Sequence, residues 1–266
     1  MAYQTINPTT NELIKTYPEH TDQQVEEALA IAHKLYKSEW SEGPIQPRLD
    51  VLRKVADLID ARAEELAQIA TREMGKLIGE SREVVWIIAV IARYYADNAE
   101  RFLARTPIQS ALGDAWVEHH PIGVLVAVEP WNFPYYQLMR VLAPALAAGN
   151  PVLAKHAPIV PHCASIFEEL VHEAGAPRGA WTNLFISNDQ IASLIADDRV
   201  QGAAMTGSER AGSAIAAQAG KHLKKSTLEM GGNDVFVVLD DSDLDKALEA
   251  GVVSAGAQGK QWRHSA

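Results

Sequence analysis

Cysteine is nearly absent from this sequence of 266 residues, in which Cys163 is the only one. A single cysteine excludes a disulfide bond within the chain, and this scarcity fits a protein of a reducing compartment. No apolar run approaches the roughly 18 residues that a membrane-spanning helix needs. The first residues are polar and lack a basic region followed by an apolar one, so we expect no signal peptide. The cytoplasm is therefore the expected location.

Positive charge is also scarce, because 24 Lys and Arg residues stand against 34 Asp and Glu residues, which gives a net charge of −10. Nucleic acids and anionic membranes are bound through basic surfaces, so we expect neither as a partner. The histidines show no metal-ligand spacing, and we expect no metal site. Apolar residues make up 47% of the chain and charged residues 22%, which is typical of a globular protein with one large domain or two.

Two kinds of sequence follow one another along the chain. After an extended stretch with a turn at Asn7-Pro8, we expect helices from Thr21, over about 47–73 and over about 78–104. From about residue 114, strand-like segments alternate with helical ones. The strand-like segments span residues 115–123, 124–134, 151–155, 182–187, 200–208, 226–232 and 234–239. This alternation predicts an α/β fold, a Rossmann-like doubly wound parallel sheet with N-terminal helices.

Ligands of an open parallel sheet bind beyond the carboxyl ends of its strands, so the residues that follow each strand matter most. Four such segments are polar or rich in glycine: residues 129–132, 155–158, 206–208 and 229–232. We expect these four segments to converge on one crevice.

Three of these segments have a plain structural interpretation beside the functional one. Backbone N–H groups at the helix start after Gly207-Ser208 can face a phosphate, or the segment is an ordinary strand-to-helix turn. Lys155 ends an apolar strand, so it either hydrogen-bonds a ribose or phosphate or extends to the surface. Asn132 can donate a hydrogen bond to a developing oxyanion, or it caps the next helix.

Two further side chains leave alternatives open. Glu229 can act as a general base if the following glycine turn and Met230 bury it in part; otherwise it is a surface carboxylate. Cys163 lies near a helix start, where the pKa of a thiol can be lowered. We nevertheless favour a small buried hydrophobic residue at Cys163.

Several motifs together resemble the aldehyde dehydrogenase superfamily, and within it the bacterial succinate-semialdehyde dehydrogenases. In chain order they are Ile6-Asn7-Pro8, TREMGK at 71–76, PWNFP at 130–134, AGNPVLAKHAP at 148–158, MTGSERAG at 205–212 and LEMGGND at 228–234. The resemblance covers nearly the whole chain, and TREMGK and AKHAP point to the succinate-semialdehyde group. It implies oxidation of a small aldehyde to the acid with reduction of NAD or NADP and, for whole family members, a homo-oligomer.

The resemblance also implies residue roles. Asn132 is the expected oxyanion donor, and Glu229 is the expected base that activates water beside a thioester. The residues expected to bind the cofactor are Trp131, Lys155, Ala157, Pro158, Gly207, Ser208, Glu229 and Gly231. Arg140 matches an arginine that holds the distal carboxylate of a semialdehyde, for which a guanidinium fork is suited.

A domain division follows from the same resemblance. Residues 1–234 are expected to form the NAD(P)-binding domain, with residues 115–123 in an oligomerisation ribbon. Residues 235–266 are expected to be a truncated start of the catalytic domain.

The sequence departs from the family pattern at two places. Pro158 occupies the place of a glutamate for the ribose hydroxyls, and without that carboxylate a 2′-phosphate meets less repulsion, so NADP is expected as readily as NAD. The nucleophilic cysteine is expected close to residue 263, where this sequence has none. We hypothesise a reading-frame shift near Gly256, because codons for residues 259–262, read one base later, can spell Ala-Asn-Asn-Gly. By itself the chain is then expected to be inactive, a non-catalytic dinucleotide-binding fragment or a frameshifted product.

Overall fold

The computed structural model describes residues 3–232 and 235–256. It divides into two units, residues 1–230 and residues 231–266. The elements of the first unit are β1 (Tyr3–Ile6), β2 (Leu13–Tyr17), α1 (Asp22–Tyr36), α2 (Glu39–Glu42), α3 (Gln46–Ala61), α4 (Ala63–Met74), α5 (Ile78–Phe102), β3 (Thr106–Ile108), β4 (Ala115–Val117), β5 (Val124–Glu129), α6 (Pro134–Ala148), β6 (Val152–His156), α7 (Pro161–Glu173), β7 (Trp181–Asn183), α8 (Asn188–Ala196), β8 (Val200–Gly207), α9 (Glu209–Lys221) and β9 (Lys225–Met230). The second unit contains α10 (Leu244–Gly256).

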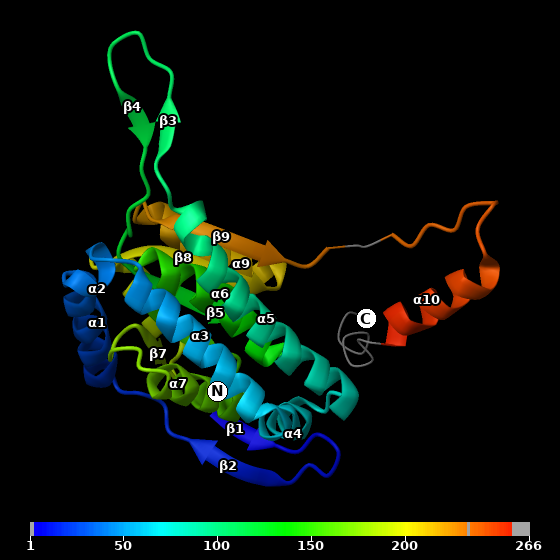
Figure 1. Ribbon diagram of the computed structural model, residues 1–266. Helices are drawn as coiled ribbons and strands as arrows, with labels where there is room; N and C mark the ends of the chain where they lie inside the picture. Colours follow the sequence, from blue (N-terminus) through cyan, green and yellow to red (C-terminus); the bar gives the residue numbers. More distant parts are fainter. Residues whose placement is uncertain (1–2, 233–234, 257–266) are drawn as a thin grey trace. The chain divides into compact units, whose positions relative to one another are not determined.

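A parallel sheet of five strands, in the order β7-β6-β5-β8-β9, forms the centre of the first unit (Figure 1). The chain passes outward through β5, β6 and β7, and α8 then returns it to β8 on the other side of β5. The strand order therefore reverses between β5 and β8, which is where ligands of doubly wound sheets bind. The predicted α/β fold with a parallel sheet is confirmed.

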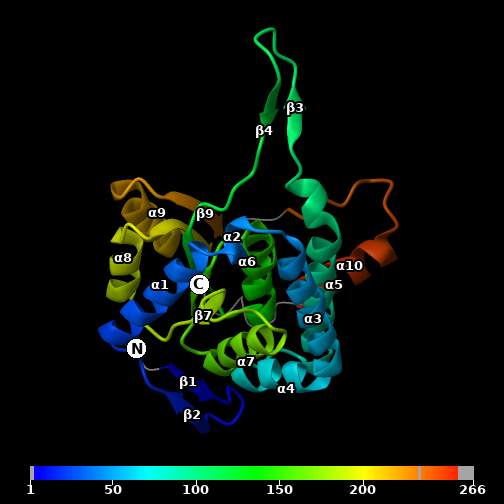
Figure 2. The same cartoon turned by 60° about the vertical axis from the view of Figure 1, so that its left-hand side comes forward.

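Helices cover both faces of this sheet (Figure 2). One core contains residues of the five helices from α3 through α7, together with strand residues such as Ala127, Val152 and Ala154. The other joins α1, α8 and α9 with Val124 and Leu153, among others. Neighbouring residues of β5 and β6 thus enter opposite cores, as the alternation of side chains along a strand requires. Two packed layers of helix fix the sheet, so the carboxyl ends of its strands form a rigid edge.

The N-terminal helices follow the predicted pattern with one difference. Thr21 caps α1 in a capping box with Gln24, which confirms the predicted start. The helix expected over residues 47–73 is two helices, α3 and α4, which meet at the non-helical residue Arg62. Its guanidinium forms ion pairs with Glu65 on α4 and with two glutamates of α7. The break therefore turns α4 so that it packs against α7, a tertiary effect that the apolar periodicity does not reveal.

The strand expected over residues 115–123 is shorter in the structure. Only Ala115–Val117 forms β4, and it pairs with β3 as an antiparallel ribbon that extends from the body of the first unit (Figures 1 and 2). Residues 118–123 lie outside β4. The sequence did not predict β3, because a strand of three residues with Pro107 at its centre gives no periodic signal.

In the second unit, the strand expected over residues 234–239 is not formed by the described part, residues 235–239. Their five apolar side chains are exposed, and they pair with no strand among the described residues. A strand needs a neighbour for its N–H and C=O groups, which apolar composition alone does not supply. Residues 257–266 lie outside the described residues. They include the place expected for the nucleophile and the residues 259–262 on which the frame-shift hypothesis depends.

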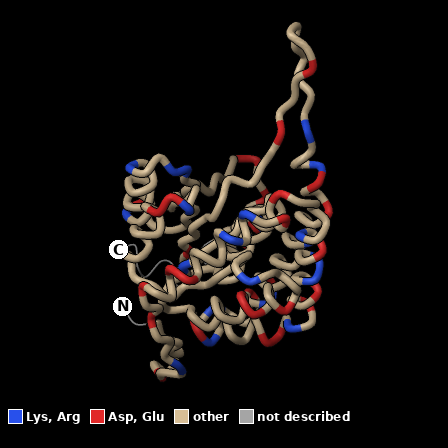
Figure 3. The backbone as a smooth tube through the Cα atoms, turned by 90° about the vertical axis from the view of Figure 1, so that its left-hand side faces the viewer, with Lys and Arg blue, Asp and Glu red and all other residues tan. Residues whose placement is uncertain are grey.

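The surface carries both charges in close mixture. Figure 3 shows Lys and Arg interspersed with Asp and Glu over the helices. Within the part of the chain that the structure describes, no helix is long and apolar enough to span a membrane. In the same residues, no three His, Cys, Asp or Glu side chains gather as metal ligands.

Candidate active site

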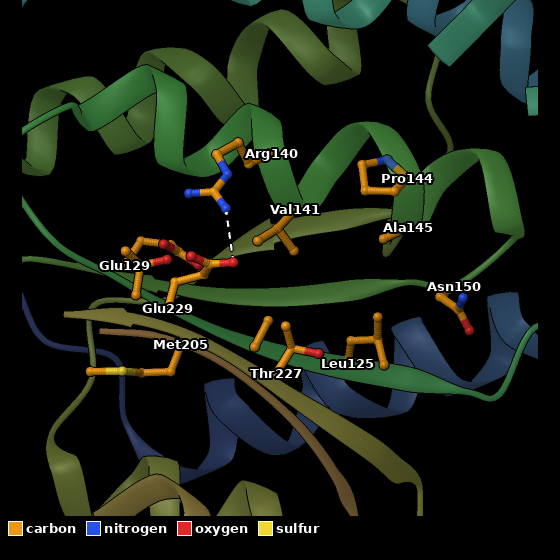
Figure 4. Close-up of a pocket in the computed structure, with 12 residues that line it drawn as sticks. Leu125, Glu129, Arg140, Val141, Pro144, Ala145, Asn150, Met205, Thr227 and Glu229 are labelled. Atoms are coloured by element: carbon orange, nitrogen blue, oxygen red, sulfur yellow. Dashed lines mark ion pairs between the residues drawn. The ribbon is translucent and has the colours of Figure 1, made fainter. Parts of the chain in front are cut away.

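A cavity of about 320 Å³ lies between α6 and the sheet, and Figure 4 shows the side chains around it. Its lining residues come from β5, β8, β9, α6 and the turn after α6: Leu125, Glu129, Arg140, Val141, Pro144, Ala145, Asn150, Ala204, Met205, Thr206, Thr227 and Glu229. Most of them are apolar or small. Three ionisable side chains, Glu129, Arg140 and Glu229, gather at the end formed by the carboxyl edge of the sheet (Figure 4).

The strand register explains why the two glutamates share one side of the sheet. Thr206 on β8 pairs with Glu229 on β9, and Val128 on β5 pairs with Met205, the residue before Thr206. Glu129, Thr206 and Glu229 therefore form a row across three neighbouring strands. By alternation this row shares the face of Ala127, which belongs to the core with α6.

Arg140 extends from α6 toward this row. Its Nη2 atom lies 3.2 Å from Oε1 of Glu229, and its guanidinium carbon lies 5.6 Å from the ring centre of Tyr136, one turn earlier. The side chains of Arg140 and Glu229 are 36% and 54% exposed, so their ion pair lies at the solvent edge of the cavity. The sequence predicted both residues, and the structure brings them into direct contact.

Glu229 itself is less enclosed than a buried general base requires. Its side chain is more than half exposed, and Met230 beside it is exposed as well. Within the first unit, Met230 therefore does not bury Glu229, and the contact that orients this carboxylate is Arg140.

Glu129 belongs to a segment that the sequence placed at the crevice, but sequence reasoning assigned it no role. It is 3% exposed, and neither carboxyl oxygen has a hydrogen-bond partner among the described residues. Burial raises the pKa of Glu129 to about 8; the Thr206 hydroxyl and Arg140 lower it only in part, and Glu229 raises it further. A signal was available, because Glu129 ends an apolar strand in the same way as Lys155 does.

The loop after β5 carries Trp131 and Asn132. Trp131 is partly buried against the core around α6. The Oδ1 atom of Asn132 is buried and has no hydrogen-bond partner among the described residues. The residue that caps α6 is Phe133, with no side-chain cap bond, so the interpretation of Asn132 as a helix cap is wrong. Asn132 thus stands at the carboxyl edge of the sheet with an amide oxygen that no described residue satisfies.

The segment from β6 to α7 contains Lys155, Ala157 and Pro158. Lys155 is only 9% exposed, so the interpretation as a lysine that extends to the surface is wrong. Its ammonium lies 5.8 Å from the ring centre of Tyr3, and burial lowers its pKa. Ala157 and Pro158 are partly buried, and the Pro158 carbonyl accepts a hydrogen bond from the Gln4 N–H at 3.1 Å. Strand β1 therefore fixes the backbone beside Lys155.

Helix α9 begins directly after β8. Ser208 is its N-cap and accepts a hydrogen bond from the Ala211 N–H at 3.3 Å. A Cβ at Gly212 would lie 2.6 Å from the sulfur atom of Met230, so this flexible side chain would have to move. Gly207 and Ser208 stand at the carboxyl edge beside the row of Glu129 and Glu229.

Cys163 lies away from the cavity, in the third position of α7. Its side chain is fully buried, and burial together with nearby Glu73 raises the pKa of its thiol well above the ordinary value. This agrees with the favoured interpretation of a small buried residue. A buried thiol with a raised pKa is a poor nucleophile.

Comparison with known proteins gives consistent matches. The model of the aldehyde dehydrogenase family matches residues 1–261. A succinate-semialdehyde dehydrogenase [NADP(+)] of Deinococcus radiodurans is 44% identical over 93% of this chain and 52% of its own length. The succinate semialdehyde dehydrogenase [NAD(P)+] Sad of Escherichia coli is 40% identical over 93% of the chain and 53% of its own length.

A solved structure agrees in fold. The crystal structure of succinic semialdehyde dehydrogenase from Streptococcus pyogenes in complex with NADP+ superimposes with a TM-score of 0.93 at 50% identity. The match covers 96% of this chain and 56% of that one. The chain thus spans about half the length of the curated relatives it matches.

Proposed function

Because the chain belongs to the aldehyde dehydrogenase family, we propose that it supplies the dinucleotide site, the base and the substrate arginine for oxidation of succinate semialdehyde by NAD(P)+. The observation that carries this proposal is the cavity in which Arg140 and Glu229 meet at the carboxyl edge of the sheet. A guanidinium beside a carboxylate base suits a substrate that is an aldehyde at one end and an acid at the other.

Asn132 and Glu229 have separate tasks in this proposal. The side-chain N–H of Asn132 donates to the oxyanion that forms when a nucleophile attacks the aldehyde carbon. Glu229 takes the proton of the water molecule that later hydrolyses the acyl group, and its exposure gives water access. Arg140 holds the distal carboxylate and so orients the aldehyde. The attacking thiolate of this family is not supplied by Cys163, which is buried.

The residues at the carboxyl edge fit a dinucleotide. Lys155 offers a nearly buried ammonium at the end of β6, and the helix start at Ser208 offers backbone N–H groups to a pyrophosphate. Trp131, Ala157 and Gly207 are proposed to line the same cleft, together with Pro158 and Gly231. When bound, the nicotinamide accepts the hydride of the aldehyde carbon.

Two observations support NADP, beside NAD, as a cofactor. Pro158 leaves the segment after Lys155 without a carboxylate that would repel a 2′-phosphate. The relative from Deinococcus is named for NADP+, and the structure from Streptococcus is a complex with NADP+.

The proposal extends to organisation and location. Residues 1–234 are assigned to dinucleotide binding and residues 235–266 to the start of the catalytic domain. The ribbon of β3 and β4 is assigned to oligomerisation, because it carries exposed Ile108 and Trp116 away from the body of the first unit. The cytoplasm suits a protein whose single cysteine is free and buried.

A second candidate function is a non-catalytic dinucleotide-binding module. The burial of Cys163 favours it, because the chain then lacks an accessible thiol. Both candidates predict dinucleotide binding, and only the first predicts a carboxylate site at Arg140.

Titration of the 266-residue chain with NADP+ and NAD+, followed by tryptophan fluorescence, tests the dinucleotide site. We expect saturable binding, and Lys155→Gln should weaken it by about 10- to 100-fold, as loss of hydrogen bonds from a charged group does. The matched control is Lys225→Gln, because Lys225 lies exposed at the amino end of β9, away from this edge. Absence of saturable binding by either dinucleotide would contradict the proposal.

A further inference from the structure

Arg140 has a partner before any substrate arrives. The proposed function gives its guanidinium to the distal carboxylate of the substrate, whereas in the structure this guanidinium holds Glu229 at 3.2 Å. Glu229 thus occupies, as an internal carboxylate, the position that a carboxylate ligand requires. The contact uses the Nη2 atom, so a carboxylate that binds both Nη atoms as a fork has to displace Glu229 from Nη2.

Glu129 is the second feature that the proposed reaction leaves unused. Its carboxyl group is almost completely buried in the wall of the same cavity. The Thr206 hydroxyl lies near it, but neither oxygen has a hydrogen-bond partner of ordinary geometry among the described residues. Buried polar groups are normally paired, so an unpaired carboxyl that faces a cavity points to a ligand. Figure 4 shows its carboxyl group beside that of Glu229, under the Arg140 guanidinium.

We propose that Arg140 and Glu129 form a subsite for a short carboxylate, and that Glu229 competes with this carboxylate for Arg140. This inference rests on the proposed function and deepens it. The incoming carboxylate accepts hydrogen bonds from the guanidinium and from the Glu129 hydroxyl. Glu229 is displaced toward solvent, to which its side chain is already half open.

The charges favour such an exchange. One carboxylate replaces another beside Arg140, so the net charge around the guanidinium does not change. The pair that breaks is exposed, and exposed ion pairs contribute little to stability. The groups that face Glu129 are Arg140 from α6, Glu229 from β9 and His156 from β6, whose Nδ1 lies 3.2 Å from the Glu129 carbonyl oxygen. Burial lowers the pKa of His156 to about 4, so it adds no charge near neutrality.

The exchange has a consequence for specificity. An aldehyde that carries a carboxylate binds the Arg140 guanidinium and displaces Glu229. An aldehyde without a carboxylate leaves Glu229 in its ion pair with Arg140. Glu129 and Glu229 then act as specificity-determining residues. The base becomes free to accept a proton only after the acidic end of the substrate has bound.

The first test is calorimetric titration of the 266-residue chain with succinate as the carboxylate probe. Glu229→Gln removes the competing charge, so it should bind succinate about tenfold more tightly than the unchanged chain, a gain typical of one charge-assisted interaction. Arg140→Gln should lose succinate binding. Succinamide, which has no charge, should not bind more tightly to Glu229→Gln. Equal or weaker succinate binding by Glu229→Gln would overturn the competition.

The second test is the pH dependence of succinate affinity between about pH 6.5 and 9.5, where succinate is ionised throughout. The pKa of Glu129 is about 8, so affinity should be highest on the acid side and fall as rising pH ionises Glu129 beside the ligand. Glu129→Gln keeps a neutral donor and should show no such fall. If this variant does not fold, carboxyl NMR of the unchanged chain should show one glutamate titrating near pH 8. A flat affinity profile, or a Glu129 that titrates near its ordinary pKa, would overturn its role.

The outcomes separate this inference from the proposed function. If NADP+ binds but succinate binds neither the unchanged chain nor Glu229→Gln, the carboxylate subsite is wrong and the dinucleotide site stands. If succinate binds both equally, Arg140 is a carboxylate site without competition, and the proposed function stands. If no dinucleotide binds, the proposed function itself fails.

Discussion

At the scale of single residues, Pro158 is the position proposed above to bear on the choice between NADP and NAD. Its ring lies three positions after Lys155, and its carbonyl is held by Gln4 of β1. Pro158→Glu places a carboxylate near the site proposed for the ribose. Because like charges repel, NADP+ affinity should fall by about tenfold, whereas NAD+ affinity should change little. Parallel fluorescence titrations with both dinucleotides measure the ratio.

The matched control for this change is Pro158→Gln, which removes the proline ring but adds no charge. It should leave the ratio of NADP+ to NAD+ affinity within about twofold of the unchanged chain. If Pro158→Glu leaves that ratio unchanged too, the 2′-phosphate is not near residue 158.

Lys155 and Glu129 show what single residues reveal in a sequence. Both end apolar strands, and the sequence singled out Lys155 because a cation there needs a partner. Glu129 received no role from the sequence because the reason for its importance is tertiary: β8 and β9 place Thr206 and Glu229 in its row. The sequence predicted that residues 129, 206 and 229 share one edge of the sheet, but it did not predict the contact of Arg140 with Glu229, because strand order cannot be derived from apolar periodicity.

At the scale of elements, helix α7 depends on a buried carboxylate from another helix. Glu73 of α4 accepts hydrogen bonds from the backbone N–H groups of His162 and Cys163 at 2.9 and 2.8 Å, and from the Thr5 hydroxyl. These N–H groups lie in the first turn of α7, which has no side-chain cap of its own. In Glu73→Gln only one side-chain oxygen can accept, although the wild-type residue accepts hydrogen bonds at both oxygens. The free energy of unfolding in urea should fall by about 1–3 kcal/mol.

Glu65 provides the control on the same helix. It is an exposed partner of Arg62, so Glu65→Gln should cost no more than about 1 kcal/mol. Similar losses for both variants would mean that Glu73 does not hold the start of α7.

Element types were more predictable than element ends. The capping box at Thr21 and the alternation after residue 114 located helices and strands, because both patterns are local. The break at Arg62, the short β4 and the unpaired residues 235–239 depend on partners distant in the sequence. Each of these differences arose where a tertiary contact, or the lack of a neighbouring strand among the described residues, decides the backbone.

At the scale of the whole molecule, the two units carry very unequal shares of the core. All buried residues that the structure describes lie in the first unit, and none lies among the described residues after Met230. Hydrophobic burial is the main source of stability. The five exposed apolar side chains of residues 235–239 instead provide a segment prone to association.

A chain that ends at Gly232 should therefore keep the fold and the dinucleotide site. Its free energy of unfolding in urea should lie within about 1 kcal/mol of the 266-residue chain, because no described core contact is removed. Its NADP+ affinity should agree within about twofold, and light scattering should show less association. A chain that ends at Lys224 is the contrasting variant, since it loses β9 and the whole ladder to β8, and it should be much less stable. If the chain that ends at Gly232 loses dinucleotide binding while it remains folded, residues beyond Gly232 complete the site.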